Sequence, residues 1–230
     1  MRRVLSLLLV LPFLLLSVRA APGTKYVALT FDDGPSGKYT RALLDGLYDR
    51  GAKATFLLCG YRLKDYPDLA QRILEEGHEI GCHGYSHDSM KAMSRRQIAQ
   101  EILDTEALLP EGCHPAFLRP PGGLSSDAVR QVAQARGLAI LHWSVDPQDW
   151  EIHNKAAIEK AVLEKVQDGD IILLHDMTTA SVEAALGIVD ALLQQDYEFV
   201  TVSELARLRG QRPKAGTVYK KFPPLEQQIK

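Results

Sequence analysis

The sequence predicts an α/β fold, a distorted (β/α) barrel of about seven parallel strands with its site at the C-terminal ends of the strands. Short apolar segments alternate along the chain with segments of helical periodicity, and short loops join them. The unusual polar residues follow the apolar segments directly, where such barrels carry their chemistry. With 230 residues, of which 46% are hydrophobic, the chain is long enough for one such domain and short for two.

The first half of the chain predicts the order β-α-β-α-β. An apolar run over residues 25–32 predicts a strand, which Gly34-Pro35 cannot continue. Leucines at helical spacing predict a helix over residues 38–50, and Gly51 ends it. Two more apolar runs flank an amphipathic segment. They predict a strand over residues 54–59, a helix over 65–76 and a strand over 79–83.

The second half continues the same alternation. Ser94 is a good N-cap for a helix over residues 95–109, whose isoleucines share one face. A fully apolar segment over residues 170–175 predicts a buried strand that ends in a histidine. The other expected elements are strands over residues 116–119, 138–143 and 198–202 and helices over residues 126–136, 156–166 and 181–194.

The two ends of the chain differ from the body in composition. Residues 1–20 have the basic start, apolar run and small-residue end of a signal peptide with cleavage after Ala20. A permanent membrane anchor is the alternative, but the apolar run is shorter than the roughly 20 residues of a span, and Pro12 interrupts it. We therefore expect one domain over residues 21–210, working outside the cytoplasm, secreted or associated with the cell wall. Residues 211–230 form a charged tail whose apolar residues are expected to dock on the body, namely Val218, Tyr219 and Phe222.

The charge and the cysteines limit the partners and the covalent links. A net charge of −2 with scattered Lys and Arg offers no field for nucleic acid or anionic lipid, so we expect a neutral or zwitterionic substrate. We also expect the protein to be a monomer. The three cysteines, Cys59, Cys82 and Cys113, allow at most one disulfide, and the sequence does not choose among the three pairings. Three separate buried thiols are the alternative.

Asp32 and Asp33 stand where the first strand becomes a loop. Adjacent strand residues point to opposite faces, so these carboxylates can serve one site only if the chain turns between them, which Gly34-Pro35 would allow. Two neighbouring carboxylates repel unless a cation or a proton neutralises one. Simple turn chemistry is the alternative explanation of this segment.

Further polar residues stand at the ends of other expected strands, which converge on one face of a barrel. His83 and His87 are four residues apart, a spacing that lets both imidazoles reach one metal ion. With Asp33 they make a set of two histidines and one carboxylate that leaves positions open for water and substrate. The remaining strand-end residues are Arg119, Asp146, Asp149 and His175.

Five ordered motifs together resemble those of the polysaccharide deacetylases, the NodB-homology family of carbohydrate esterases. They are Thr-Phe-Asp-Asp-Gly-Pro at 30–35, His-x-x-x-His at 83–87, Arg-Pro-Pro-x-Gly at 119–123, Asp-x-x-Asp-Trp at 146–150 and Leu-x-His at 173–175. The resemblance spans about residues 24–208. Domain 21–210 is therefore expected to be a deacetylase domain of this family.

The resemblance implies a role for each matching residue. Asp32 would be the general base, and Asp33, His83 and His87 would bind a divalent metal, with zinc expected first and cobalt, nickel or iron also suitable. The other implied catalytic residues are Arg119, which would hold Asp32 ionised, His175, which would be the general acid, and Asp149, which would orient His175, with Asp146 as the competing partner.

The resemblance also implies a substrate groove. Trp150 and Leu173 would form an apolar slot for the acetyl methyl group, and Gly122 with Pro120 would bind substrate beside them. Two residues depart from the usual family pattern. Gly84 replaces a Ser or Thr whose hydroxyl braces the loop, so that loop is expected to be less constrained, and Gly122 often is a tyrosine in the family.

The expected activity is removal of N-acetyl groups from a β-1,4-linked amino-sugar polymer, peptidoglycan or chitin-like, with release of acetate. An O-acetyl esterase acting on xylan is an alternative within the enzymes, because the same site could cleave an ester. A non-catalytic glycan-binding protein is an alternative outside them. Acetate release separates the last alternative from the first two, and appearance of a free amine separates the deacetylase from the esterase.

Overall fold

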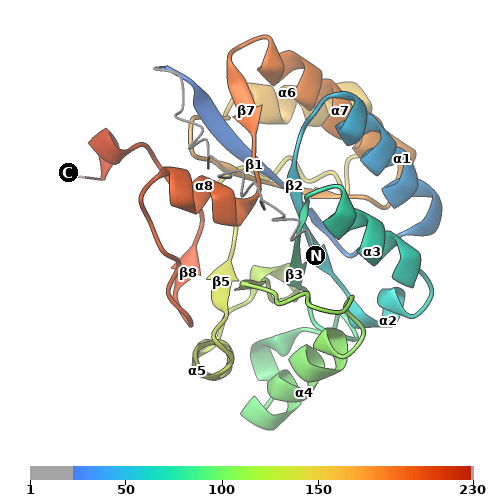
Figure 1. The fold of residues 1–230 in the computed structure, drawn as a ribbon, viewed down its shortest axis with the longest axis vertical. Coiled ribbons are helices and arrows are strands. Elements are labelled where there is room, and N and C mark those ends of the chain that lie inside the picture. Colours follow the sequence, from blue (N-terminus) through green and yellow to red (C-terminus); the bar gives the residue numbers. More distant parts are fainter. Residues whose placement is uncertain (1–22, 229–230) are drawn as a thin grey trace, which may run out of the picture.

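The structure, a computed structural model, describes residues 23–228. In this part of the chain a single eight-stranded sheet is covered by helices (Figure 1). The signal peptide predicted at residues 1–20 lies outside the described residues. Among the residues from 23 to 228, no helix has the length and apolar content needed to cross a membrane.

The described elements alternate in type along most of the chain. The strands are β1 (Lys25–Asp32), β2 (Ala54–Leu58), β3 (Glu79–Cys82), β4 (Phe117–Leu118), β5 (Ala139–Leu141), β6 (Ile171–His175), β7 (Tyr197–Phe199) and β8 (Val218–Tyr219). The α-helices are α1 (Gly37–Asp49), α2 (Gly60–Leu63), α3 (Pro67–Glu75), α4 (Arg95–Glu106), α5 (Asp127–Arg136), α6 (Lys155–Leu163), α7 (Thr179–Leu193) and α8 (Val202–Leu208). Short 3₁₀ helices are η1 (Met90–Ala92), η2 (Pro121–Gly123) and η3 (Leu225–Gln227).

The strands pair in parallel in the order β6-β1-β2-β3-β4-β5-β8, and β7 also pairs with β1. Isolated bridges of Val145 with Ile172 and of Asp170 with Lys221 join the two ends of this sheet. The sheet therefore curls into a distorted barrel, and the predicted α/β class with parallel strands is confirmed.

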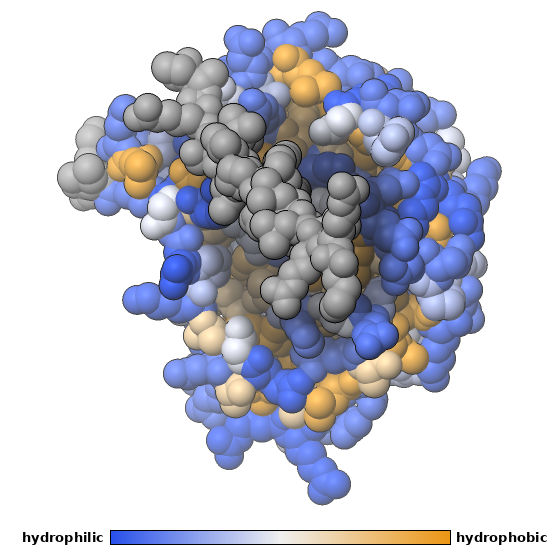
Figure 2. All heavy atoms as spheres, in the orientation of Figure 1, coloured by the Kyte–Doolittle hydropathy of each residue, from blue (hydrophilic) through white to orange (hydrophobic). Residues whose placement is uncertain are grey.

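Alternation along β1 determines which face carries the site. Val27, Leu29 and Phe31 are buried against the helices, in a cluster with apolar residues of α1, α3, α6 and α7. Thr30 and Asp32 alternate with them along the strand and therefore point to the inner face of the curled sheet. Figure 2 shows hydrophilic side chains over most of the outer surface, with smaller hydrophobic patches among them.

Each of the seven predicted strands corresponds to one of β1–β7, although several strand and helix ends differ from the prediction. The last strand was expected to reach residue 202, whereas β7 ends at Phe199 and α8 begins at Val202. The hydroxyl of Thr201 accepts a hydrogen bond from the N–H of Glu204 at 3.2 Å, which caps this unpredicted helix. The helix expected over residues 65–76 begins only at Pro67, and α2 precedes it as a separate turn.

The C-terminal segment docks on the body, as expected. Val218 and Tyr219 form β8 and pair with Ile140 and Leu141 of β5. Phe222 is 0% exposed, and its ring stacks on that of Tyr219 with centroids 5.3 Å apart. This segment therefore contributes both an edge strand and a core side chain.

The three cysteines are free in the structure. Cys59 and Cys82 are buried, and Cys113 is half-buried. Burial raises the pKa of Cys82 to about 12 and raises the pKa of Cys59 as well. Both thiols therefore stay protonated and pack as small apolar side chains.

Candidate active site

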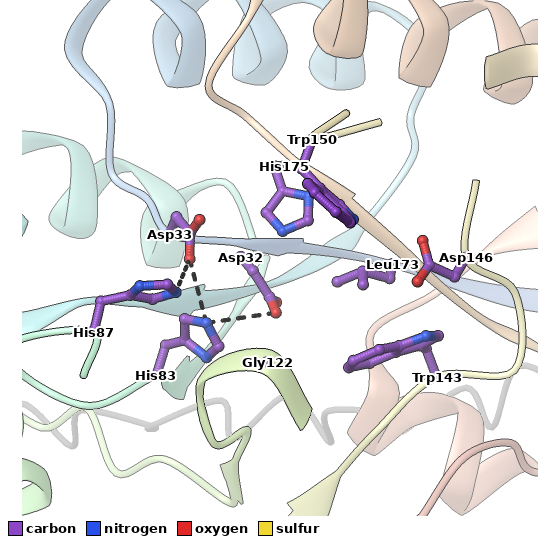
Figure 3. A pocket seen from close by; sticks show the side chains of 10 residues that line it. All are labelled: Asp32, Asp33, His83, His87, Gly122, Trp143, Asp146, Trp150, Leu173 and His175. Atoms are coloured by element: carbon purple, nitrogen blue, oxygen red, sulfur yellow. Dashed lines mark ion pairs between the residues drawn. The ribbon is translucent and has the colours of Figure 1, made fainter. Parts of the chain in front are cut away.

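The carboxyl end of β1 places two acidic side chains at one edge of the sheet. Asp32, the last residue of β1, is 3% exposed and lies beside Leu57 of β2 and His175 of β6. Asp33 follows with a φ of 70°, in the left-handed region that few non-glycine residues occupy. This turn redirects the chain, so both carboxylates face one pocket (Figure 3).

Asp33 lies against two imidazoles. Its Oδ1 atom is 3.3 Å from Nε2 of His83 and 3.0 Å from Nε2 of His87. Nδ1 of His83 lies 2.7 Å from the backbone oxygen of Arg119, which can only accept a hydrogen bond, so Nδ1 carries the proton and Nε2 of the neutral ring is bare. Asp33 Oδ1 is itself buried without a hydrogen-bond donor. Lone pairs therefore converge on one point.

This donor set fits a divalent cation. One ligand atom from each of Asp33, His83 and His87 lies within 4.8 Å of the others. Burial opposes ionisation of Asp33, but the two adjacent imidazoles, when protonated, hold its pKa well below the usual range. Two histidines and one carboxylate leave coordination positions open for water and substrate. These three residues form a metal-binding triad.

The loop that carries the histidines is braced by α4. One oxygen of Glu101 accepts hydrogen bonds from the backbone N–H groups of Tyr85 at 2.7 Å and Ser86 at 2.8 Å, and the other accepts from the Ser86 hydroxyl at 3.0 Å. Gly84 has a φ of 82°, and a Cβ there would come within 2.9 Å of Cε of Met90. The glycine therefore suits this turn. The loop was expected to be less constrained without a Ser or Thr hydroxyl at this position, but Glu101 braces it instead.

Asp32 is held by a buried arginine. Nη1 of Arg119 donates to Oδ1 of Asp32 at 2.6 Å and to the hydroxyl of Thr30 at 2.8 Å. The other guanidinium nitrogens donate to the backbone oxygens of Leu141 at 3.2 Å and His142 at 2.9 Å. Arg119 is 0% exposed, so its charge is desolvated and acts at short range on Asp32. The guanidinium thereby ties β4 to β1 and to the end of β5.

The other carboxylate oxygen of Asp32 points toward the triad. Oδ2 lies 3.7 Å from Nε2 of His83, whereas Oδ1 is taken by Arg119. One oxygen thus anchors the carboxylate, and the other faces the place where the triad's lone pairs meet (Figure 3).

His175, the last residue of β6, pairs with Asp149 rather than Asp146. Its Nδ1 atom lies 2.8 Å from Oδ1 of Asp149, and its backbone N–H donates to Oδ2 of Asp149 at 2.9 Å. Asp146 instead accepts a hydrogen bond from the backbone N–H of Gln148 at 2.7 Å. The structure therefore selects one of the two partners that the sequence left open.

The environment of His175 favours the imidazolium. Burial works against the charged ring, but the bond to Asp149 and the charges of Asp149, Asp32 and Asp33 raise the pKa of His175 to about 9. A protonated imidazole with Nδ1 bonded to a carboxylate presents its Nε2–H to the pocket.

The pocket is about 370 Å³ in volume and contains most of the predicted substrate residues. Leu173 is 4% exposed and forms part of the pocket floor, whereas Trp150 is 56% exposed and lies at the pocket rim. Pro120 does not line the pocket, and its backbone oxygen accepts from Gly123 N–H at 2.9 Å within the η2 turn. The lining residues are Asp32, Asp33, His83, His87, Gly122, Trp143, Asp146, Trp150, Leu173 and His175.

Two residues that shape the site were not predicted from the sequence. Trp143 lines the pocket on the side of Gly122 (Figure 3), and only its place at the end of a predicted strand could have indicated it. Asp176, which is fully buried, accepts a hydrogen bond from Thr40, whose hydroxyl in turn accepts from Ser36 N–H at 2.7 Å. Burial raises the pKa of Asp176 to about 6. Asp176 thus fixes the loop that follows Asp33.

Comparison with known proteins agrees with this geometry. A family model described as polysaccharide deacetylase matches residues 19–141. The chain is 37% identical over 193 residues to the peptidoglycan-N-acetylmuramic acid deacetylase PdaC of Bacillus subtilis, covering 83% of this chain and 41% of that protein. It is 39% identical over 191 residues to a peptidoglycan-N-acetylglucosamine deacetylase of Bacillus cereus, covering 80% of this chain and 90% of that protein.

Solved structures show the same fold. A family 4 acetyl xylan esterase from Clostridium thermocellum, in complex with a cobalt ion, superposes with a TM-score of 0.81 at 35% identity, covering 86% of this chain and all of that one. The chain spans about two fifths of the length of the first curated relatives it matches, although it covers 90% of the Bacillus cereus protein. The matches of sequence and structure, together with the metal-binding triad, place the chain in the polysaccharide deacetylase family.

Proposed function

We propose that this chain is a metal-dependent hydrolase that removes N-acetyl groups from a β-1,4-linked amino-sugar polymer, peptidoglycan or chitin-like, and releases acetate. The observation that carries this proposal is that the two carboxylate oxygens of Asp32 have different partners. Arg119 holds one of its oxygens, and the other faces the metal-binding triad within 3.7 Å of His83. A carboxylate in that position can take a proton from a water attacking beside the triad.

The reaction needs a base, an acid and a means of stabilising charge. Asp33, His83 and His87 would hold a divalent cation, which would lower the pKa of a bound water and polarise the amide carbonyl. Asp32 accepts the proton of the attacking water. His175 donates the proton on Nε2 to the leaving nitrogen, which would otherwise depart as a strongly basic amide anion. Backbone N–H near Gly122 is the donor we assign to the developing oxyanion.

The remaining site residues position these groups. Asp149 keeps the proton on Nδ1 of His175 and favours the imidazolium. Trp150 and Leu173 supply apolar walls suited to an acetyl methyl group. The metal we propose is zinc, while cobalt, nickel or iron suit the same ligands, and supply in the cell decides among them. Residues 1–20 support a location outside the cytoplasm, and we propose a monomer, which gel filtration of the purified chain would check.

The test is acetate release from a panel of acetylated glycans, with free amine measured in parallel. We expect both products in equal amounts from an N-acetylated amino-sugar polymer, with activity lost on chelation and restored by added metal. Acetate without amine, from acetylated xylan alone, would establish the esterase instead. The acetyl xylan esterase structure, with its similar fold, is the reason to include that substrate. Full activity in metal-free protein would remove the role of Asp33, His83 and His87.

A further inference from the structure

A second groove lies directly beside the catalytic pocket. Gly122 and Trp143 line the pocket, and their chain neighbours Gly123 and His142 line the groove. A Cβ on Gly123 would come within 2.7 Å of Cη2 of Trp143, so the turn is packed against the indole ring. The wall between the catalytic pocket and the groove therefore consists of one backbone turn and the indole ring of Trp143.

Three cations converge on this groove from different parts of the chain. Lys91 comes from η1, Arg130 from α5 and Lys220 from the residue after β8. Figure 1 shows α5, β5 and β8 together on one side of the molecule. The docked C-terminal segment contributes Val218 and Lys220 to the lining of the groove. The full lining is Lys91, Gly123, Leu124, Ser125, Arg130, His142, Val218 and Lys220.

None of these cations has a carboxylate partner within the described residues. Lys91, Arg130 and Lys220 are exposed, and no ion pair of residues 23–228 includes them. No acidic side chain lines the groove. Burial and then the charges of Arg119, Lys220 and Arg130 lower the pKa of His142, whose Nε2 lies 3.1 Å from the Ser125 hydroxyl. The groove therefore keeps three positive charges without a negative one.

The catalytic pocket on the other side of the wall is lined by three carboxylates, Asp32, Asp33 and Asp146, and by the imidazoles of His83, His87 and His175. The groove differs, because its charged side chains are all cations. Three like charges gathered in one groove repel one another, and a cleft lined by one sign of charge concentrates ligands of the other sign. A substrate that crosses the wall would thus meet the metal-binding triad and the catalytic groups at the reacting sugar and cations beside it.

On the basis of the proposed deacetylase function, we propose that the groove of Lys91, Arg130 and Lys220 binds the carboxylates of an acidic glycan. Peptidoglycan carries such groups on its peptide stems, or on its lactyl ethers where the stem has been removed, whereas chitin-like oligomers are neutral. The groove would make this chain prefer a peptide-bearing glycan strand. The overall charge of −2, which suggested a neutral or zwitterionic substrate, conceals this local cationic surface.

The test compares kcat/KM for acetate release on two substrates of equal sugar length, a neutral N-acetylglucosamine oligomer and a peptidoglycan fragment that retains its peptide stems. We expect the triple variant Lys91→Gln, Arg130→Gln, Lys220→Gln to lose about tenfold or more on the acidic fragment and less than about twofold on the neutral one, since charge-assisted contacts are lost only with the former. Raising the salt concentration should reduce the preference of the unmodified protein and leave the variant unaffected.

The matched control removes two lysines and one arginine elsewhere, as Lys160→Gln, Lys165→Gln, Arg207→Gln. These side chains are exposed and line neither hollow. We expect this control to keep the preference. Equal losses on both substrates, or an unchanged preference in the groove variant, would overturn the inference.

Failure of the proposed function itself has a separate signature. If the unmodified protein released acetate from neither substrate, that proposal would fall, and the groove would be tested by titrating the peptide-bearing fragment into both proteins. Salt-sensitive binding that the groove variant loses would support the anion site alone. Equal binding by both proteins, or no binding, would refute it.

Discussion

Replacing Asp149 by asparagine tests whether His175 works as an acid because of its buried partner. The bond from Asp149 and its charge are the leading causes that raise the pKa of His175 to about 9, against the effect of burial. Without that carboxylate, burial and the remaining charges of Asp32 and Asp33 oppose each other. We expect the pKa to fall to about 6.5 or below.

The size of the effect depends on pH. A histidine with a raised pKa keeps its active, protonated form at low pH and loses it as the pH rises through that pKa. At pH 8 an imidazole of pKa about 9 is about 90% protonated, whereas one of pKa about 6.5 is about 3% protonated, so the rate should fall about 30-fold. At pH 6 both forms are mostly protonated, and the protonation effect shrinks to less than about twofold.

The assay is the turnover rate at saturating substrate from pH 5 to pH 10, for the unmodified protein, Asp149→Asn and Asp146→Asn at equal metal content. A cation at the triad lowers the pKa of His175 in all three proteins and moves the pH values at which these losses appear to lower pH. The comparison therefore rests on the difference between the alkaline limbs of their pH–rate profiles. We expect the limb to move to lower pH only in Asp149→Asn. A limb that stays in place there, or one that moves in Asp146→Asn, would refute this pairing as the source of the acid.

Three further changes test the base, the metal loop and the docked tail. Asp32→Asn should keep its metal and lose about 10²–10⁴-fold in turnover, because the amide cannot accept the proton; joint loss of metal and rate would exchange its role with that of Asp33. Glu101→Ala should weaken metal affinity about 10- to 100-fold in a chelator competition, since it braces the histidine loop; unchanged affinity would show that the loop holds itself. Phe222→Ala should cost about 3–5 kcal/mol in denaturant unfolding, and a loss below about 1 kcal/mol would mean that the tail docks without supporting the fold.

The strands and the catalytic edge could be predicted because they depend on local patterns. Each strand core is a short apolar run, and parallel strands bring their carboxyl ends to one edge whatever their order. Asp32, Asp33 and His175 were therefore expected to lie together, and the structure places all three in the lining of one pocket.

The remaining features depend on backbone turns and distant contacts. The choice of Asp149 over Asp146 follows from the turn at Gln148, whose φ is 57° and whose N–H bonds to Asp146. Neither fact is visible in the residue types. Glu101 acts on a loop 15 residues away in the sequence. A buried Asp176 also has no periodic signal, because its environment forms only when β6 meets the loop after β1.

The ion pair of Asp32 and Arg119 links the reaction to the survival of the fold. Arg119 is wholly enclosed, and Asp32 is its carboxylate partner within the described chain. Deleting one member of a buried ion pair costs about 3–5 kcal/mol, a large share of the roughly 5–15 kcal/mol that holds a domain together. An evolved protein with a small apolar residue in place of Asp32 would thus also have a lower free energy of unfolding. Natural selection for a stable sugar-binding protein would therefore disfavour a small apolar residue in place of Asp32, even where catalysis was no longer needed.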